Sequence, residues 1–152
     1  ATQPIEDLGV RRVIVRSAVV LGKRGGLLGL MALPIRLFAG GPLGSGKQAM
    51  PWIHLADWVG AVRHLIADES ARGAYNLIAP TPTSNAEFNK TLAGVLRRPY
   101  WFPTPAFLLR NVLGEMSVLI LDGRFSQPKR LLDSGYTFQF SGPREALTDL
   151  LG

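Results

Sequence analysis

The stretch Gly40–Trp58 gathers the residues of this chain that are best suited to hold a small polar molecule. A glycine-rich loop carries one cation and one amide, Lys47 and Gln48, and leads into a short apolar strand that ends at His54. Glycine lets the backbone approach a ligand closely, although glycine-rich loops are also common as plain turns. The residue types therefore leave two interpretations open, a ligand-binding loop and a solvated connection.

The same loop matches part of the P-loop that binds nucleoside triphosphates. Residues 41–47 (GPLGSGK) fit the first seven positions of G-x-x-x-x-G-K-[ST], but the eighth is Gln48, which lacks the hydroxyl that binds magnesium. Pro51 and a strand-like Trp-Ile-His follow, where a P-loop needs a helix to hold the phosphates. The segment Val118–Asp122 fits the apolar strand and acid of such a site but reads equally well as a helix. A P-loop-like nucleotide-binding protein is thus the less favoured alternative.

The composition excludes several kinds of site. The chain has 152 residues, no cysteine and two histidines, so a thiolate metal site and a disulfide framework are both impossible. No carboxylates stand where they would complete a zinc site, and we predict no metal. The net charge of +6 suits an anionic small molecule or an acidic partner. Because the cations are spread along the sequence, we predict no nucleic-acid binding.

The sequence carries no sign of a membrane segment. No apolar run approaches the roughly 20 residues that a membrane-spanning helix needs, and no signal peptide is recognisable. We therefore predict no membrane association and, by default, a cytoplasmic location. The chain opens at Ala1 without an initiator methionine, and Gly9 fits the cap of a helix tail, so we expect a piece of a longer protein.

Strands and helices alternate over residues 1–98, which predicts an α/β architecture. The valine-rich segment Arg11–Leu21 is typical of a strand buried on both faces, with a bend near Ser17. Residues Ser84-x-x-Glu87 form a capping box that opens a helix. The other expected elements are a helix at 27–38, a strand at 52–54, a helix at 55–67 with Val59, Val62 and Ile66 on one face, and a strand at 74–79.

A second, mostly helical unit is expected over residues 99–152. Pro105 and Pro128 suit the starts of two helices, the second at Lys129–Ser134. Tyr136–Phe140 alternates like a half-buried strand, and Pro143 opens a final helix over 144–151.

The order of these segments resembles a known family. RRVIVRSAVVLG, GGPLGSGKQAMPWIHLADWVGAV, GAYNLIAPTPTSNAEFNKTLAGVLRRP and PKRLLDSGYTF follow one another without a break. Together they resemble the C-terminal half of sugar-nucleotide epimerases, the atypical extended short-chain dehydrogenase/reductases that end in a small domain of unknown function. The resemblance covers essentially the whole chain. It implies the last parallel strands and substrate lobe of a Rossmann-type domain, followed by a small, mostly helical tail domain.

The resemblance also implies what this chain lacks. Family members carry a glycine-rich NAD(P) loop and a catalytic tyrosine, often in Tyr-x-x-x-Lys, ahead of the strand that corresponds to Arg11–Leu21. None of Tyr75, Tyr100 and Tyr136 has a lysine at the fourth position after it. We therefore predict no catalytic residue in this chain, and we expect NADP or NAD to be bound mainly by the missing N-terminal half.

By the same resemblance, one short segment lies near the nicotinamide end of the cofactor, and a second group of side chains meets the substrate diphosphate and hydroxyls. The implied cofactor-side residues are Ser17, Ala18, Val19 and Val20; the implied substrate-binding residues are Arg36, Lys47, Gln48 and His54. For His54 the alternative is a structural role at the strand end, and for Asp57 we favour a helix cap over ligand contact. Trp52 and Trp58 are predicted core residues.

Two functions from different classes follow. The first is the substrate-binding half of an NAD(P)-dependent nucleoside-diphosphate-sugar epimerase or oxidoreductase, acting on a small molecule. The second is a non-catalytic basic module that binds an anion or a partner. The first predicts that one sheet face of this chain is exposed, which favours homo-oligomers.

Overall fold

Two small parallel sheets form the centre of the computed structural model, which describes residues 8–23, 26–42, 45–101 and 126–152. Strand β1 (Val13–Ser17) pairs with β4 (Gly73–Leu77), and β2 (Val19–Leu21) pairs with β3 (Trp52–His54). The expected strand at 11–21 is thus divided at Ala18, one residue beyond the predicted bend. The amide of Ala18 still donates to Leu77, whereas that of Val19 donates to Pro51. The chain changes its partner strand at this residue.

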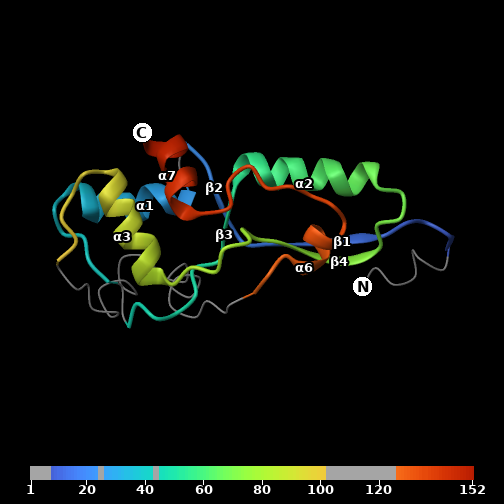
Figure 1. The fold of residues 1–152 in the computed structure, drawn as a ribbon, viewed down its shortest axis with the longest axis horizontal. Coiled ribbons are helices and arrows are strands. Elements are labelled where there is room, and N and C mark those ends of the chain that lie inside the picture. The colour runs from blue at the N-terminus through green and yellow to red at the C-terminus, as the bar shows by residue number, and fades with distance from the viewer. Residues whose placement is uncertain (1–7, 24–25, 43–44, 102–125) are drawn as a thin grey trace.

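Helices cover both sheets. Helix α2 (Leu55–Ala67) runs along β1 and β4 at one end of the elongated molecule (Figure 1). Helices α1 (Gly26–Arg36), α3 (Asn85–Val95) and α7 (Pro143–Leu151) gather at the other end, with β2 and β3 between the two groups. The short helix α6 (Lys129–Asp133) lies against β4. The predicted α/β fold class is confirmed.

The buried apolar residues form two clusters. The helical cluster joins α1, β2, α3 and α7 around Trp52 and Phe88; its other fully buried members include Leu21, Leu92 and Leu147. The sheet cluster joins α2, β4 and α6; its members include Ile53, Ala61, Leu77 and Leu131. Trp52 and Ile53 point to different clusters because successive side chains of a strand alternate. The pair β2–β3 therefore lies at the boundary between the clusters.

The predicted helix and its apolar stripe are present, but most of the stripe lies outside the core. Its fully or nearly fully buried residues are Asp57, Ala61 and Leu65, whereas Val59 and Ile66 are 42% and 66% exposed. Ile66 and Val62 instead line a groove of about 260 Å³ together with Val13 and Val15 of β1. Val62 is partly buried and packs on the sheet cluster, whereas Val59 and Ile66 are exposed among the described residues.

Strand β1 is also more exposed than its composition predicts. It pairs with β4 along one edge, and no described residue pairs with the other edge. Residues 15–17 are exposed, with Val15 at 37%. The prediction of a strand buried on both faces is therefore wrong for this chain as it stands.

The C-terminal segment matches the prediction in its helices but not in its strand. The Ser84–Glu87 capping box, α6 and α7 are all present. Residues 136–140 form no strand, because the amides of Gln139 and Phe140 donate to a side chain of α2 instead of to a neighbouring strand. The helix expected from Pro105, the alternatives weighed for 118–122 and the start of the chain at 1–7 lie outside the described residues.

Candidate functional site

The basic loop is fixed against the start of α3. Gly46 has a φ of +68°, and a Cβ at this position would stand 2.9 Å from the Cβ of Ala86, so only glycine fits. The carbonyl of Gln48 accepts from the amide of Asn85 at 2.8 Å, and the Gln48 side chain accepts from Ser45 at 3.0 Å. Lys47 between them is exposed. The loop therefore holds its backbone firmly while it presents the ammonium group to solvent.

The loop is not a P-loop. No helix begins at Lys47, and the next element of the chain is strand β3. The amides that would hold nucleotide phosphates are therefore missing, and the P-loop-like alternative fails on geometry.

Arg36 ends α1 and, like Lys47, is exposed. Neither cation forms an ion pair with another residue that the structure describes. Both are therefore available to an anion, but no observed contact brings them together.

The predicted cofactor-side residues lie where the two sheets meet. Ser17 ends β1, Ala18 is the break, and Val19 and Val20 begin β2. The indole N–H of Trp58 on α2 donates to the Ser17 hydroxyl at 2.8 Å. Ligands of open parallel sheets bind outside the carboxyl ends of the strands, and Ser17 occupies such an end. Trp58, predicted as core, is half-buried and holds this strand end in place.

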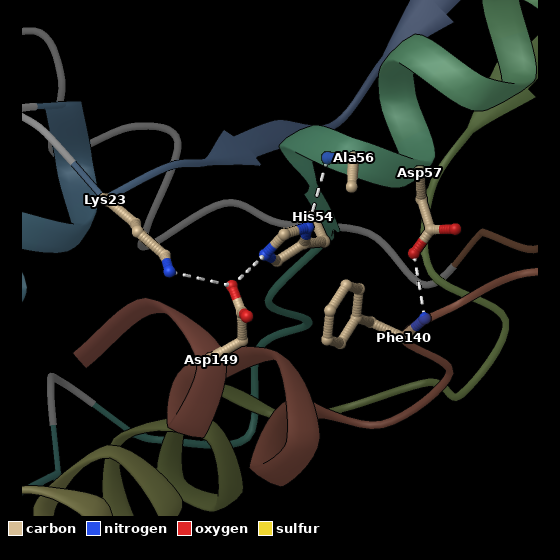
Figure 2. A network of polar contacts seen from close by, with 6 residues as sticks. All are labelled: Lys23, His54, Ala56, Asp57, Phe140 and Asp149. Atoms are coloured by element: carbon tan, nitrogen blue, oxygen red, sulfur yellow. Dashed lines mark hydrogen bonds and ion pairs between the residues drawn. The ribbon is translucent and has the colours of Figure 1, made fainter. Parts of the chain in front are cut away.

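His54 has structural contacts on both of its ring nitrogens (Figure 2). It is 6% exposed; Nδ1 accepts from the amide of Ala56 at 3.1 Å and so caps α2, and Nε2 lies 3.3 Å from Asp149 Oδ2. Because Nδ1 accepts, the neutral ring carries its hydrogen on Nε2, facing the carboxylate. The alignment there is too poor for a hydrogen bond, and the contact is electrostatic. The Phe140 ring packs against the imidazole, with the ring centres 4.0 Å apart and the ring planes tilted by 32°. These contacts match the strand-end alternative, and substrate contact by His54 stays a prediction.

Asp57 is the polar residue whose role the sequence analysis missed. It does not cap α2; it lies in the first turn, fully buried, with its carboxylate pointing to the C-terminal segment. Oδ1 accepts from the Gln139 amide at 2.8 Å and from the Tyr136 hydroxyl at 3.1 Å, and Oδ2 accepts from the Phe140 amide at 3.0 Å. A buried carboxylate is stable only when its oxygens are satisfied in this way.

Tyr136 completes this arrangement. Burial raises the pKa of its hydroxyl well above the ordinary value, and the charge of Asp57 and the hydrogen bond to it raise the pKa further. The hydroxyl therefore stays protonated at neutral pH and is shared between the carboxylate and the backbone carbonyl of Asp57, which is 3.0 Å away.

Because Tyr136 lies close to α2, we expect Gly60→Ala to destabilise the protein when Tyr136 is present and to stabilise it when Tyr136 is replaced by phenylalanine. A Cβ on Gly60 would stand 2.5 Å from the Tyr136 hydroxyl oxygen. We expect Gly60→Ala to lower the free energy of unfolding by about 1–3 kcal/mol. In a Tyr136→Phe background the nearest ring carbon is 3.4 Å away, and alanine should stabilise the helix by up to about 1 kcal/mol. Urea unfolding of the four proteins measures both values. An equal cost in both backgrounds would show that the hydroxyl is not the obstacle.

A groove of about 730 Å³ opens beside His54, between α2 and α7. Its lining includes the apolar Leu55, Val59 and Leu150 and the cations Lys23 and Arg63. Lys23 Nζ lies 3.6 Å from Asp149 Oδ2.

Among residues 8–23, 26–42, 45–101 and 126–152, no three side chains are arranged to hold a metal ion. No helix in those ranges is long and apolar enough to cross a membrane.

The chain is similar in sequence and fold to known proteins. Residues 104–150 match a family described as a domain of unknown function (DUF1731). The chain is 41% identical over 149 residues to the epimerase family protein YfhF of Bacillus subtilis, which covers 98% of this chain and 49% of that protein. A solved structure of the human epimerase family protein SDR39U1 with NADPH is 40% identical, with a TM-score of 0.85 over 92% of this chain and 48% of the human one.

The chain is a relative of the epimerase family proteins. The predicted resemblance and the Rossmann-type fold are thereby confirmed. A nucleoside-diphosphate sugar epimerase from Corynebacterium glutamicum is also similar, with 28% identity and a TM-score of 0.77 over 99% of this chain and 28% of that one. The chain spans about half the length of the curated relatives it matches, and it corresponds to their C-terminal half. The exposed edge of β1 and the uncovered stripe of α2 agree with this partial coverage.

Proposed function

We propose that this chain is the substrate-side half of an NAD(P)-dependent epimerase or oxidoreductase of the epimerase family. The observation that carries the proposal is the exposed carboxyl end of β1 at Ser17, beside a strand edge that no described residue covers. An epimerase family relative of 40% identity has been solved with NADPH, which supports a nicotinamide cofactor. The choice between NADP and NAD belongs to the half that lies outside this chain.

In this proposal the backbone from Ser17 to Val20 lines the nicotinamide end of the cofactor. Trp58 on α2 holds this backbone in place through its hydrogen bond to the Ser17 hydroxyl. The other half of the protein covers the β1 edge and the groove formed by Val15, Val62 and Ile66. Burial of this apolar surface would stabilise the joined halves. A second copy of the chain is the alternative occupant of that edge.

The substrate in this proposal is a nucleoside diphosphate sugar. Lys47 and Arg36 are exposed cations suited to a diphosphate, and the Gln48 amide stands next to Lys47 on the same fixed loop. His54 supports α2 through its Nδ1 contact, and its contact with the substrate stays a prediction. The epimerisation or reduction itself needs a catalytic residue from the other half, since none is proposed in this chain.

An NADPH titration followed by nicotinamide fluorescence tests the proposal. The chain alone should bind no NADPH. The extended protein, which adds the N-terminal half found in the full-length relatives, should bind it. In the extended protein, Lys47→Ala should weaken binding of UDP-glucose, used as the probe, and leave NADPH affinity unchanged. Failure of the extended protein to bind NADPH would contradict the proposal. Anion binding by the chain alone, without cofactor, would favour the basic binding module instead.

A further inference from the structure

We infer that Asp57 is a positioning residue that ties the C-terminal segment, residues 136–140, to the strand junction at Ser17–Val20. The inference rests on the proposed function in one respect, that this junction lies beside the nicotinamide. It gives the C-terminal part of the chain a role: residues 136–140 act as a strap that fixes the cofactor-side backbone.

The hold of Asp57 on the strap is set by the backbone. Two of its three hydrogen bonds come from consecutive main-chain amides, those of Gln139 and Phe140. Amide donors fix the register of the strap whatever its side chains are. The third bond, from the Tyr136 hydroxyl, is charge-assisted, which makes it stronger than a neutral one. The first turn of α2 therefore cannot shift without moving the strap.

The same turn of α2 holds the strand junction. Trp58 follows Asp57 directly, and successive side chains of a helix point about 100° apart. Asp57 thus faces the strap while Trp58 reaches Ser17, at 2.8 Å. At the start of the helix, His54 pairs with Leu21 in the parallel register of β2 and β3 and stacks on Phe140 of the strap. Both ends of the junction are therefore connected to the strap through one turn of helix.

The strap also crosses between the two hydrophobic clusters where the junction does. Tyr136 and Phe138 pack on the sheet cluster, and Phe140 packs on the helical cluster. The crossing at Gln139–Phe140 is the point held by Asp57. Figure 1 shows this segment running from α6 back past α2 to α7. A strap anchored on both sides opposes a change in the angle between the two sheets, which meet at Ala18.

Cofactor binding in the extended protein tests the coupling, with two ligands that differ only in the nicotinamide. We expect Asp57→Asn to weaken NADPH binding about tenfold and to leave the affinity for 2′-phospho-ADP-ribose unchanged. Trp58→Phe, which removes the indole N–H and keeps most of the bulk, should show the same selective loss. Asp68→Asn is the matched control, because Asp68 follows the far end of α2 and its carboxylate accepts from the amide and hydroxyl of nearby Ser70. A parallel loss of both ligands, or no loss of either, would overturn the inference.

Hydrogen exchange on the chain as it stands tests the same coupling without any cofactor. The amides of Ala18 and Val19 donate to Leu77 and Pro51, and their exchange reports the junction. We expect Asp57→Asn and Trp58→Phe to speed their exchange, and Asp68→Asn to leave it unchanged. Faster exchange in the strap alone, with the junction unaltered, would overturn the inference. If the extended wild-type protein fails to bind NADPH, the proposed function fails while this arm still decides the coupling.

Discussion

Asp57→Ala should lower the free energy of unfolding by about 2–4 kcal/mol. The substitution leaves the partly buried amides of Gln139 and Phe140 without this acceptor, and an unpaired group that water cannot reach costs about 1–3 kcal/mol. It also leaves the Tyr136 hydroxyl with one partner in place of two. Chemical denaturation, read by tryptophan fluorescence, measures the change.

The control for this prediction is Asp68→Ala. That carboxylate accepts from the amide and hydroxyl of Ser70 within an exposed turn, and its removal should cost less than about 1 kcal/mol. If both substitutions cost about the same, the contacts of Asp57 with the strap do not stabilise the fold as argued here.

Phe88→Ala should have an effect of similar size, about 3–5 kcal/mol, because it opens a cavity in the helical cluster. Phe88 on α3 is fully buried, and its ring centre lies 6.2 Å from that of Trp52. Leu21 of β2 belongs to the same cluster, so the loss should also loosen the strand that follows the junction. Denaturation measures the stability of the variant.

Phe88→Leu and Leu33→Ala are the matched controls. The first keeps most of the buried volume and should cost less than about 1.5 kcal/mol. The second shortens a side chain of α1 that is 55% exposed and should be nearly neutral. A loss from Phe88→Ala no larger than that from Leu33→Ala would mean that the helical cluster does not sustain the fold.

The local signals of the sequence predicted the elements well. The capping box at Ser84 and Glu87 and the helix that starts after His54 depend on contacts between near neighbours in the chain. Such contacts leave a pattern of residue types at fixed spacing. The sequence also predicted a bend near Ser17, one residue before the observed break at Ala18.

The role of Asp57 could not be predicted in this way. Its partners Gln139 and Phe140 lie 82 and 83 positions away, and they contribute main-chain amides that any residue except proline would supply. An acid in the first turn of a helix is favoured in any case, so its type gave no hint of a distant partner. Tyr136 carried the one usable signal, since a tyrosine in an apolar, alternating segment needs a partner for its hydroxyl.

The interpretation of Tyr136–Phe140 as a strand failed for a related reason. Alternation predicts a side-chain pattern, and it does not show whether the backbone pairs with a strand or with a carboxylate. The stripe of Val59, Val62 and Ile66 is apolar as predicted, but periodicity does not show how deeply such a face is buried, and Val59 and Ile66 are exposed among the described residues.

Hydrogen exchange of the extended protein with and without NADPH tests the central claim most directly. If the backbone at Ser17–Val20 lies beside the nicotinamide, NADPH should slow exchange in peptides that span this junction, and 2′-phospho-ADP-ribose should protect them less. If NADPH binds and protects the preceding half while exchange at the junction is unchanged, this chain does not contribute to the cofactor site.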